Sequence, residues 1–312
     1  MNNAAFIFPG QGSQAVGMGK NLFDNFASAK EVFKEADDAL NFKLSELCFS
    51  GNEDELALTA NTQPAILATS VAAYRVLSEE GISKADYVAG HSLGEYSALV
   101  AAGSLSLRDA VQTVRNRGKY MQEAVPVGAG AMAAILGLPL DDVKVCCDEV
   151  AQGEVCAPAN INSPKQIVIA GDTSAVERAC IVLKEKGAKR AIMLNVSAPF
   201  HCSLMMPAQM RLAADLEKVA FSEPLMPIVE NVSAEVNLNG ERARTALIEQ
   251  VSSPVLWLQS MELLLQKGVT KFIELGQGKV LSSLARQINR DVACSNVEDL
   301  DSLKNTINTF RN

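Results

Sequence analysis

The chain has few histidines, an unpatterned set of cysteines and a deficit of positive charge. Its 312 residues include 2 His, 7 Cys and 1 Trp, and 28 Lys and Arg against 36 Asp and Glu give a net charge of −8. That charge argues against nucleic acid as a partner. No C-x-x-C pair occurs, and an odd, scattered set of cysteines predicts reduced thiols rather than a disulfide framework or a zinc site. We therefore expect no bound metal.

Long apolar runs and a basic N-terminal region are also missing. Hydrophobic residues make up 48% of the chain and the mean hydropathy is +0.10, which suits a large core without a membrane-spanning segment. No basic region precedes the first apolar stretch, so no signal peptide is evident. We expect a cytoplasmic protein that binds no membrane. The length exceeds the usual size of one core, so two domains are expected.

The most informative stretch reads G-x-S-x-G around Ser92. An apolar strand is expected over 85–89, and a helix over 93–102 that stops at Gly103, a typical C-terminal cap. A serine on so sharp a strand-to-helix turn presents its hydroxyl outward, and the helix directs unpaired N–H groups and its positive end toward whatever the serine attacks. Although the pattern is loose by itself, this context favours a nucleophile over a chance match.

A nucleophilic serine needs a base, and the chain offers two histidines. His91 directly precedes Ser92, and adjacent side chains on a tight turn point apart, so we interpret His91 as filling space behind the turn. His201 follows an expected strand and begins a new helix. We therefore favour His201 as the group that accepts the serine proton and returns it to the leaving group. Cys202 is conceivable as a nucleophile, but a small apolar filler is the better interpretation.

Arg117 is expected to face inward. The segment 106–123 is predicted to be a helix, with Ser106 and Asp109 as a capping pair. Arg117 lies at the margin of its apolar stripe, whereas Arg108 lies opposite. A buried guanidinium is costly unless it meets an anion. That anion could be a structural Asp or Glu, or the carboxylate of a substrate held by the planar guanidinium fork. We favour the substrate.

The predicted fold class is α/β, with two domains. Residues 126–130 read as a linker, and the segments 131–136, 140–150, 155–160, 166–170, 175–186 and 190–196 predict the order β-α-β-β-α-β of a ferredoxin-like unit. Residues 1–127 and 198–312 alternate strands and helices and predict a large α/β-hydrolase-like domain with a parallel sheet. The small domain then spans 128–197, and Ser92 and His201 meet in the cleft between the domains.

Two glycine-rich loops mimic nucleotide-binding motifs. The loop that begins at Gly10 reads G-x-G-x-x-A, but Pro9 separates it from the preceding strand, and residues 28–40 look helical where a second strand is required. The loop that begins at Gly276 has too short a glycine spacing for a phosphate loop, and Val280 replaces the required Ser or Thr. Neither loop therefore predicts a nucleotide cofactor.

Several motifs in sequence order carry a family resemblance. They are Phe8-Pro9-Gly10-Gln11-Gly12-Ser13-Gln14, Gln63-Pro64, Gly90-His91-Ser92-Leu93-Gly94-Glu95, Arg117-Gly118, Ala198-Pro199-Phe200-His201 and Glu274-Leu275-Gly276-Gln277-Gly278-Lys279. Together they resemble the malonyl-CoA:acyl carrier protein transacylase family and span nearly the whole chain. Gln277 stands where many relatives carry proline, a departure that we interpret as harmless.

The resemblance implies a role for each site residue. Ser92 would carry the acyl group and His201 would be the base. The backbone N–H groups of Gln11 and Leu93 would form the oxyanion hole, Arg117 would hold the malonyl carboxylate, and the Gln250 backbone carbonyl would accept a hydrogen bond from His201. Phe200 resembles the malonyl-selective pattern, where a serine accompanies larger acyl groups.

The implied reaction is a two-step transfer of malonyl from malonyl-CoA to the phosphopantetheine thiol of acyl carrier protein. No metal or redox cofactor is called for, and a monomer is expected. Two alternatives remain open: a serine hydrolase such as a thioesterase, and a non-catalytic module that binds carrier protein. Arg117 and the lack of an evident Asp partner for the histidine count against the hydrolase. Two interpretations remain open for Lys189, Arg190, Lys279 and Arg286: a basic patch that docks an acidic carrier protein, or an ordinary solvated charged face.

Overall fold

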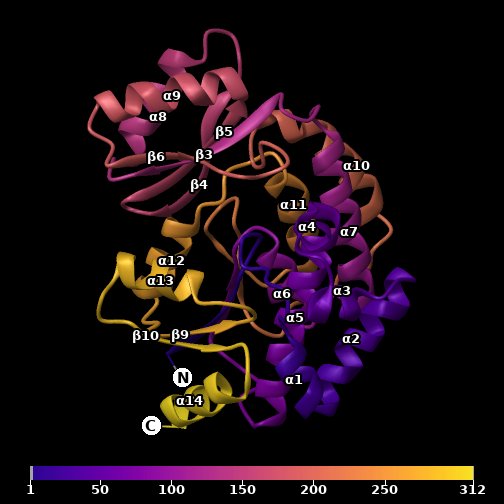
Figure 1. The fold of residues 1–312 in the computed structure, drawn as a ribbon. Helices are drawn as coiled ribbons and strands as arrows, with labels where there is room; N and C mark the ends of the chain where they lie inside the picture. Colours follow the sequence, from indigo (N-terminus) through magenta and orange to yellow (C-terminus); the bar gives the residue numbers. More distant parts are fainter. Residues whose placement is uncertain (1–2, 312) are drawn as a thin grey trace.

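The computed structural model describes residues 3–311 and is a mixed α/β structure with two sheets (Figure 1). The larger sheet has the strand order β10-β9-β1-β2-β7-β8. Its first five strands run parallel, and β8 pairs antiparallel with β7. The strands of this sheet are β1 (Ala4–Phe8), β2 (Tyr87–Gly90), β7 (Ile228–Val229), β8 (Val236–Asn237), β9 (Lys271–Leu275) and β10 (Ala293–Val297).

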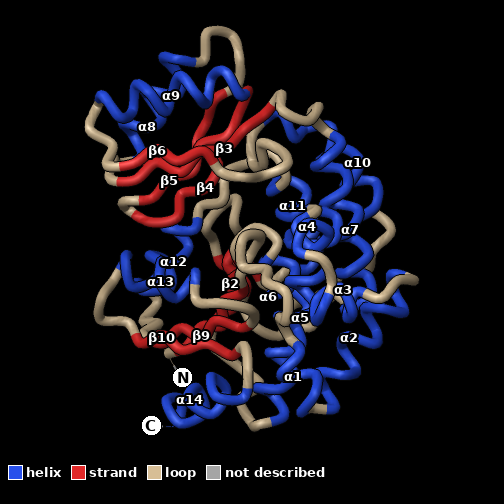
Figure 2. Tube along the Cα trace, in the orientation of Figure 1, coloured by secondary structure: helices blue, strands red, loops and turns tan. Residues whose placement is uncertain are grey.

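Helices cover both faces of the larger sheet, as its buried parallel strands require. Alternate residues of β1 point to opposite faces: Phe6 and Phe8 join the main core, and Ala5 and Ile7 join a second core with α12 and α13. Figure 2 shows the helices of the main core massed on one side. The helices of this part are α1 (Lys20–Asn25), α2 (Ala27–Leu40), α3 (Leu44–Ser50), α4 (Glu53–Ala57), α5 (Thr59–Glu79), α6 (Gly94–Ala101), α7 (Leu107–Glu123), η1 (Ser203–Met205), α10 (Met206–Leu216), α11 (Gly240–Gln250), α12 (Trp257–Gln266), α13 (Val280–Ile288) and α14 (Leu300–Arg311).

The smaller sheet is antiparallel, with the order β4-β5-β3-β6. Its unit contains β3 (Gly130–Leu136), α8 (Leu140–Val150), β4 (Cys156–Ser163), β5 (Gln166–Asp172), α9 (Thr173–Glu185) and β6 (Arg190–Met193), so the expected β-α-β-β-α-β order is present. Helices α8 and α9 cover one face of this sheet. Met132, Ala134, Val168 and Ala170 on the other face belong to the main core. The smaller sheet therefore packs against the part of the molecule that contains the larger sheet.

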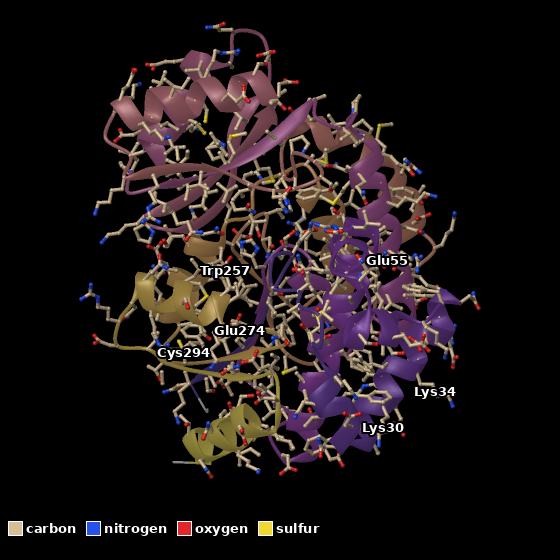
Figure 3. All side chains as sticks on the ribbon, viewed as in Figure 1. Lys30, Lys34, Glu55, Trp257, Glu274 and Cys294 are labelled. Carbon is tan, nitrogen blue, oxygen red and sulfur yellow. The ribbon has the colours of Figure 1, made fainter. Side chains whose placement is uncertain are left out.

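Backbone hydrogen bonds also join the smaller sheet to the segment that precedes α12. Val255, which precedes α12, donates to the Ala159 carbonyl at 2.9 Å and accepts from the Ile161 amide at 2.9 Å. Figure 3 shows Trp257 where α12 starts, below the smaller sheet. This link connects β4 directly to the segment that follows Gln250.

The expected elements are present with shifted ends. The strand expected over 85–89 is β2 at Tyr87–Gly90, and its pairing with β1 begins at Tyr87 opposite Ala5. The amide of the preceding Asp86 donates to the Ala4 carbonyl at 2.9 Å. The strand expected over 190–196 ends at Met193, since the chain turns back there and the Val196 amide donates to the Leu194 carbonyl.

Among the helices of residues 3–311, none combines the length and apolar character that a membrane span needs.

Candidate active site

Ser92 lies on the turn between β2 and α6 with a positive φ of 51°, which non-glycine residues rarely adopt. The turn packs tightly against β1: a Cβ at Gly94 would collide with the Phe8 carbonyl oxygen. The glycine of the motif is therefore needed for this close approach, which places the start of α6 directly behind the serine hydroxyl.

His201 is the histidine that meets the serine. Its Nε2 lies 2.7 Å from Ser92 Oγ, and its Nδ1 lies 2.8 Å from the backbone carbonyl oxygen of Gln250. Because a carbonyl only accepts, Nδ1 carries the proton and Nε2 presents its lone pair to the serine hydroxyl. Burial, reinforced by the charge of Arg117, lowers the pKa of His201 to about 3. The imidazole is therefore neutral and ready to accept a proton.

His91 adjoins Ser92 in the sequence and Cys202 adjoins His201, but neither takes part in the contact between Ser92 and His201. His91 Nε2 is 2.8 Å from Asn162 Oδ1, and its ring lies 5.5 Å from that of Trp257. Burial lowers the pKa of His91. The Cys202 thiol donates to the Pro199 carbonyl, and burial raises its pKa to about 11. Both side chains match the space-filling interpretation.

Arg117 projects from α7 into the site and is 2% exposed. Its Nη2 donates to Ser92 Oγ at 3.1 Å and to Gln250 Oε1 at 2.9 Å, and its Nη1 donates to Gln63 Oε1 at 2.9 Å. A Cβ at Gly118 would lie 2.5 Å from the Thr59 carbonyl oxygen, so this glycine lets α7 approach α5 closely enough for these contacts.

Within residues 3–311, no carboxylate forms an ion pair with Arg117, and its Nε has no hydrogen-bond partner. Burial lowers the pKa of the guanidinium, although Glu95 and Tyr96 lie near enough to counter part of that shift. The structural salt bridge that the sequence left open is not present in the described part of the chain. A buried cation held by neutral amides beside the nucleophile is a site for an anionic group.

Gln11 and Leu93 line the same cavity of about 110 Å³ as Ser92, Arg117 and His201. Neither backbone amide donates a hydrogen bond within residues 3–311. Buried or half-buried N–H groups normally have partners, so two unpaired amides beside a nucleophile mark where a developing negative charge can be held. The structure thus gathers all six sequence-predicted site residues in one place.

A second cavity of about 230 Å³ adjoins the first and shares Gln11, His91, Asn160 and Leu194 with it. Its walls come from the smaller sheet on one side and from α13 on the other, where Val280 is exposed. The cavity that Ser92 lines therefore adjoins a second cavity between the smaller sheet and α13.

Sequence reasoning assigned no role to Asn231 or to the Gln63 side chain. Asn231 contacts the backbone of the serine turn, and Gln63 holds the guanidinium. Glu95 of the G-H-S-L-G-E motif, quoted only as part of the resemblance, is 2% exposed and accepts from Gln250. The sequence signal that could have indicated these residues is the presence of acidic and amide side chains inside otherwise apolar segments.

No cluster of three or more His, Cys, Asp or Glu residues in the described part of the chain could hold a metal ion.

Comparison with known proteins places this site in a family. The acyl transferase domain family matches residues 5–302. The malonyl CoA-acyl carrier protein transacylase of Bacillus subtilis (strain 168) is 49% identical over 312 residues, covering 100% of this chain and 98% of that protein. The chain belongs to the malonyl CoA-acyl carrier protein transacylase family. The resemblance drawn from the motifs and the assignment to the acyltransferases are therefore confirmed.

Solved structures agree with this membership. The transacylase from Coxiella burnetii is 40% identical, covers 99% of this chain and 98% of its own, and superposes with a TM-score of 0.97. A malonyl-transacylase solved in complex with a type II PKS acyl-carrier protein is 46% identical, with a TM-score of 0.95 and coverage of 98% and 99%. The shared fold is a mixed α/β structure with a parallel sheet.

Proposed function

We propose that this protein transfers the malonyl group of malonyl-CoA to the phosphopantetheine thiol of acyl carrier protein through a malonyl-serine intermediate. The observation that carries the proposal is the arrangement at one hydroxyl: Ser92 Oγ lies 2.7 Å from His201 Nε2 and 3.1 Å from Arg117 Nη2. A base and an anion-binding guanidinium thus meet at the attacking atom.

In the first half-reaction, Ser92 Oγ forms a bond to the thioester carbon of malonyl-CoA. Its proton passes to His201 Nε2, the C–S bond breaks, and the same proton goes to the departing CoA thiolate. The Gln11 and Leu93 amides hold the oxyanion, an effect of about 3–4 kcal/mol for one such donor in other enzymes. The Arg117 fork holds the malonyl carboxylate.

In the second half-reaction, the phosphopantetheine thiol gives its proton to His201 and attacks the serine ester. The C–O bond then breaks and Ser92 recovers the proton. The Gln250 carbonyl keeps His201 in the required tautomer throughout. These residues suffice for the transfer, so the proposal includes neither a metal nor a redox cofactor.

The proposal extends to domain organisation and setting. We interpret residues 128–197 as a ferredoxin-like insertion in a hydrolase-like domain formed by 1–127 and 198–312. The supporting observations are the element order β-α-β-β-α-β and the sheet order β4-β5-β3-β6. A cytoplasmic monomer without membrane or nucleic-acid partners remains our expectation.

Carrier protein is proposed to dock at the basic patch formed by Lys189, Arg190, Lys279 and Arg286. All four residues are exposed, and none forms an ion pair within residues 3–311. Arg190 is the first residue of β6 and Lys189 directly precedes it. Arg286 lies on α13 and Lys279 directly precedes that helix. The patch thus draws on both sides of the boundary between the sheets.

The test is an assay with malonyl-CoA and reduced carrier protein, in which malonyl-carrier and free malonate are both quantified. We expect malonyl-carrier as the main product and little malonate. Malonate released faster than malonyl-carrier forms would favour a thioesterase, and no turnover of either kind would favour a non-catalytic binding module. The absence of a carboxylate on His201 Nδ1, whose partner is a backbone carbonyl, supports transfer over the hydrolase alternative.

A further inference from the structure

The backbone on both sides of the nucleophile is held by one side-chain amide. Asn231 Oδ1 accepts from the Ser92 amide at 2.7 Å, and Asn231 Nδ2 donates to the Gly90 carbonyl at 2.7 Å. Asn231 follows β7, the strand that pairs with β2, and is 1% exposed. Its side chain therefore replaces the backbone partner that β2 loses where the chain turns toward α6.

Asn231 is itself fixed by Glu95, which lies in the first turn of α6. Glu95 Oε2 accepts from the Asn231 backbone amide at 3.2 Å and from Gln250 Nε2 at 2.7 Å. Gln250 Nε2 also donates to the Ser92 carbonyl at 2.9 Å. The Ser92 amide is thus bound by Asn231 and the Ser92 carbonyl by Gln250. The buried carboxyl of Glu95 accepts a hydrogen bond from each of these two residues.

We propose that Asn231 is a positioning residue for the nucleophile, and that Glu95 anchors it. The inference rests on the proposed function, because it concerns the acylation of Ser92. Ser92 holds a positive φ that its surroundings must maintain, and displacement of a reacting atom by about 1 Å can cost about 10²-fold in rate. Asn231 touches neither Ser92 Oγ nor Arg117, so its effect falls on the turn and not on recognition of the carboxylate.

Only a group with one donor and one acceptor in the same plane satisfies both contacts. An ionised carboxylate of the same shape has two acceptors and would face the Gly90 carbonyl with a negative charge. A protonated carboxyl has one O–H and one C=O, which restores both contacts. In Asn231→Asp, the ionised side chain should therefore lose the contact with the Gly90 carbonyl, whereas the protonated side chain should make both contacts.

The charged groups around this position come from several elements. Glu95 lies on α6, and Glu230 adjoins Asn231 and is paired with Arg242 of α11 at 2.6 Å; Arg117 lies on α7. Burial, with Glu230 as a further cause, raises the pKa of Glu95 to about 8, and that of His201 is about 3. Between pH 5 and pH 7 neither Glu95 nor His201 changes its main protonation state, so the unmodified protein should acylate at a constant rate there.

The experiment measures the rate of Ser92 acylation at saturating malonyl-CoA from pH 5 to pH 7, with melting temperature as the check on folding. Asn231→Ala should be slower by about 10-fold or more, with KM changed less than about twofold and an unaltered malonyl-to-acetyl ratio. Asn231→Asp should approach the unmodified rate at pH 5, where its buried carboxyl is protonated, and should slow as the pH rises and that carboxyl ionises. Asn237→Ala is the matched control, because Asn237 is also buried and bonds the backbone of Asn239 in both directions.

Ser92 labelling by phenylmethylsulfonyl fluoride gives a second readout that does not depend on malonyl-CoA. If the unmodified protein is labelled but not malonylated, the proposed function fails, and slower labelling of the Asn231 variants still supports the positioning role. Acylation or labelling of Asn231→Ala at the unmodified rate would overturn the proposal. So would an Asn231→Asp protein as slow as Asn231→Ala at pH 5, equal losses in Asn237→Ala, or unfolding of both Asn231 variants.

Discussion

Replacement of Arg117 by alanine should shift the preference of the site from malonyl toward acetyl groups. The guanidinium is 2% exposed and forms no ion pair within residues 3–311. Its hydrogen bonds go to Ser92 Oγ, Gln63 and Gln250, all of them uncharged groups. In the proposed function, the substrate carboxylate is the anion that compensates this buried charge. Removal of the guanidinium would then leave the carboxylate desolvated and unpaired.

The size of the effect follows from that geometry. Loss of one partner of a buried ion pair costs about 3–5 kcal/mol, which corresponds to a fall of about 150-fold to about 5,000-fold in kcat/KM for malonyl-CoA. Acetyl-CoA has no carboxylate, so its transfer should be unchanged or faster, because an uncompensated buried cation is gone. Arg117→Lys should keep part of the activity, since an ammonium supplies the charge without the planar fork.

The assay is the ratio of malonyl to acetyl kcat/KM, measured on protein whose melting temperature shows that it is folded. Arg108→Ala is the matched control, because Arg108 lies on the same helix and is exposed. A folded Arg117→Ala protein with an unchanged ratio would refute the reasoning. If the variant unfolds while Arg117→Lys does not, the arginine serves the core of α5 and α7 rather than the substrate.

Three further results are expected. His201→Ala should slow acylation by about 10²-fold or more, measured as the rate of CoA release, and a smaller loss would remove His201 as the base. The kcat/KM for malonyl-CoA should stay constant from pH 7 to pH 5, because the pKa of His201 is about 3 and the neutral imidazole persists; a histidine at its ordinary pKa would lose more than about 20-fold over this range. Charge reversal at two residues of the docking patch should raise KM for carrier protein and spare acylation by malonyl-CoA; equal changes in both half-reactions would show that the patch is wrong. The residues to combine are Lys189, Arg190, Lys279 and Arg286.

The reactive side chains could be predicted from the sequence because the chain has few histidines and because its motifs and helical periodicity limit the candidate residues. With two histidines available, the tight turn at Ser92 excluded His91 and left His201, and the helical stripe showed that Arg117 faces inward. Element order also followed from periodicity, whereas strand ends depended on contacts such as the Asp86 amide with Ala4.

Other parts of the site give little or no local signal. The expected helix start at Leu93 indicated N–H groups directed at the reacting group, but only the family resemblance named the Gln11 and Leu93 amides and the Gln250 carbonyl that accepts from His201. Asn231 lies 141 positions from Gly90, and its role depends on β7 pairing with β2, a register that no motif specifies. The low pKa of His201 likewise arises from burial that only the folded chain provides.

The most direct test of the account is the intact mass of the protein after incubation with malonyl-CoA alone, followed by mapping of the modified peptide. We predict a mass increase of one malonyl group located on Ser92, and none in Ser92→Ala. This adduct should disappear when reduced carrier protein is added, as malonyl-carrier forms. Full transfer activity by Ser92→Ala, or an adduct on another residue such as Cys202, would contradict the serine mechanism.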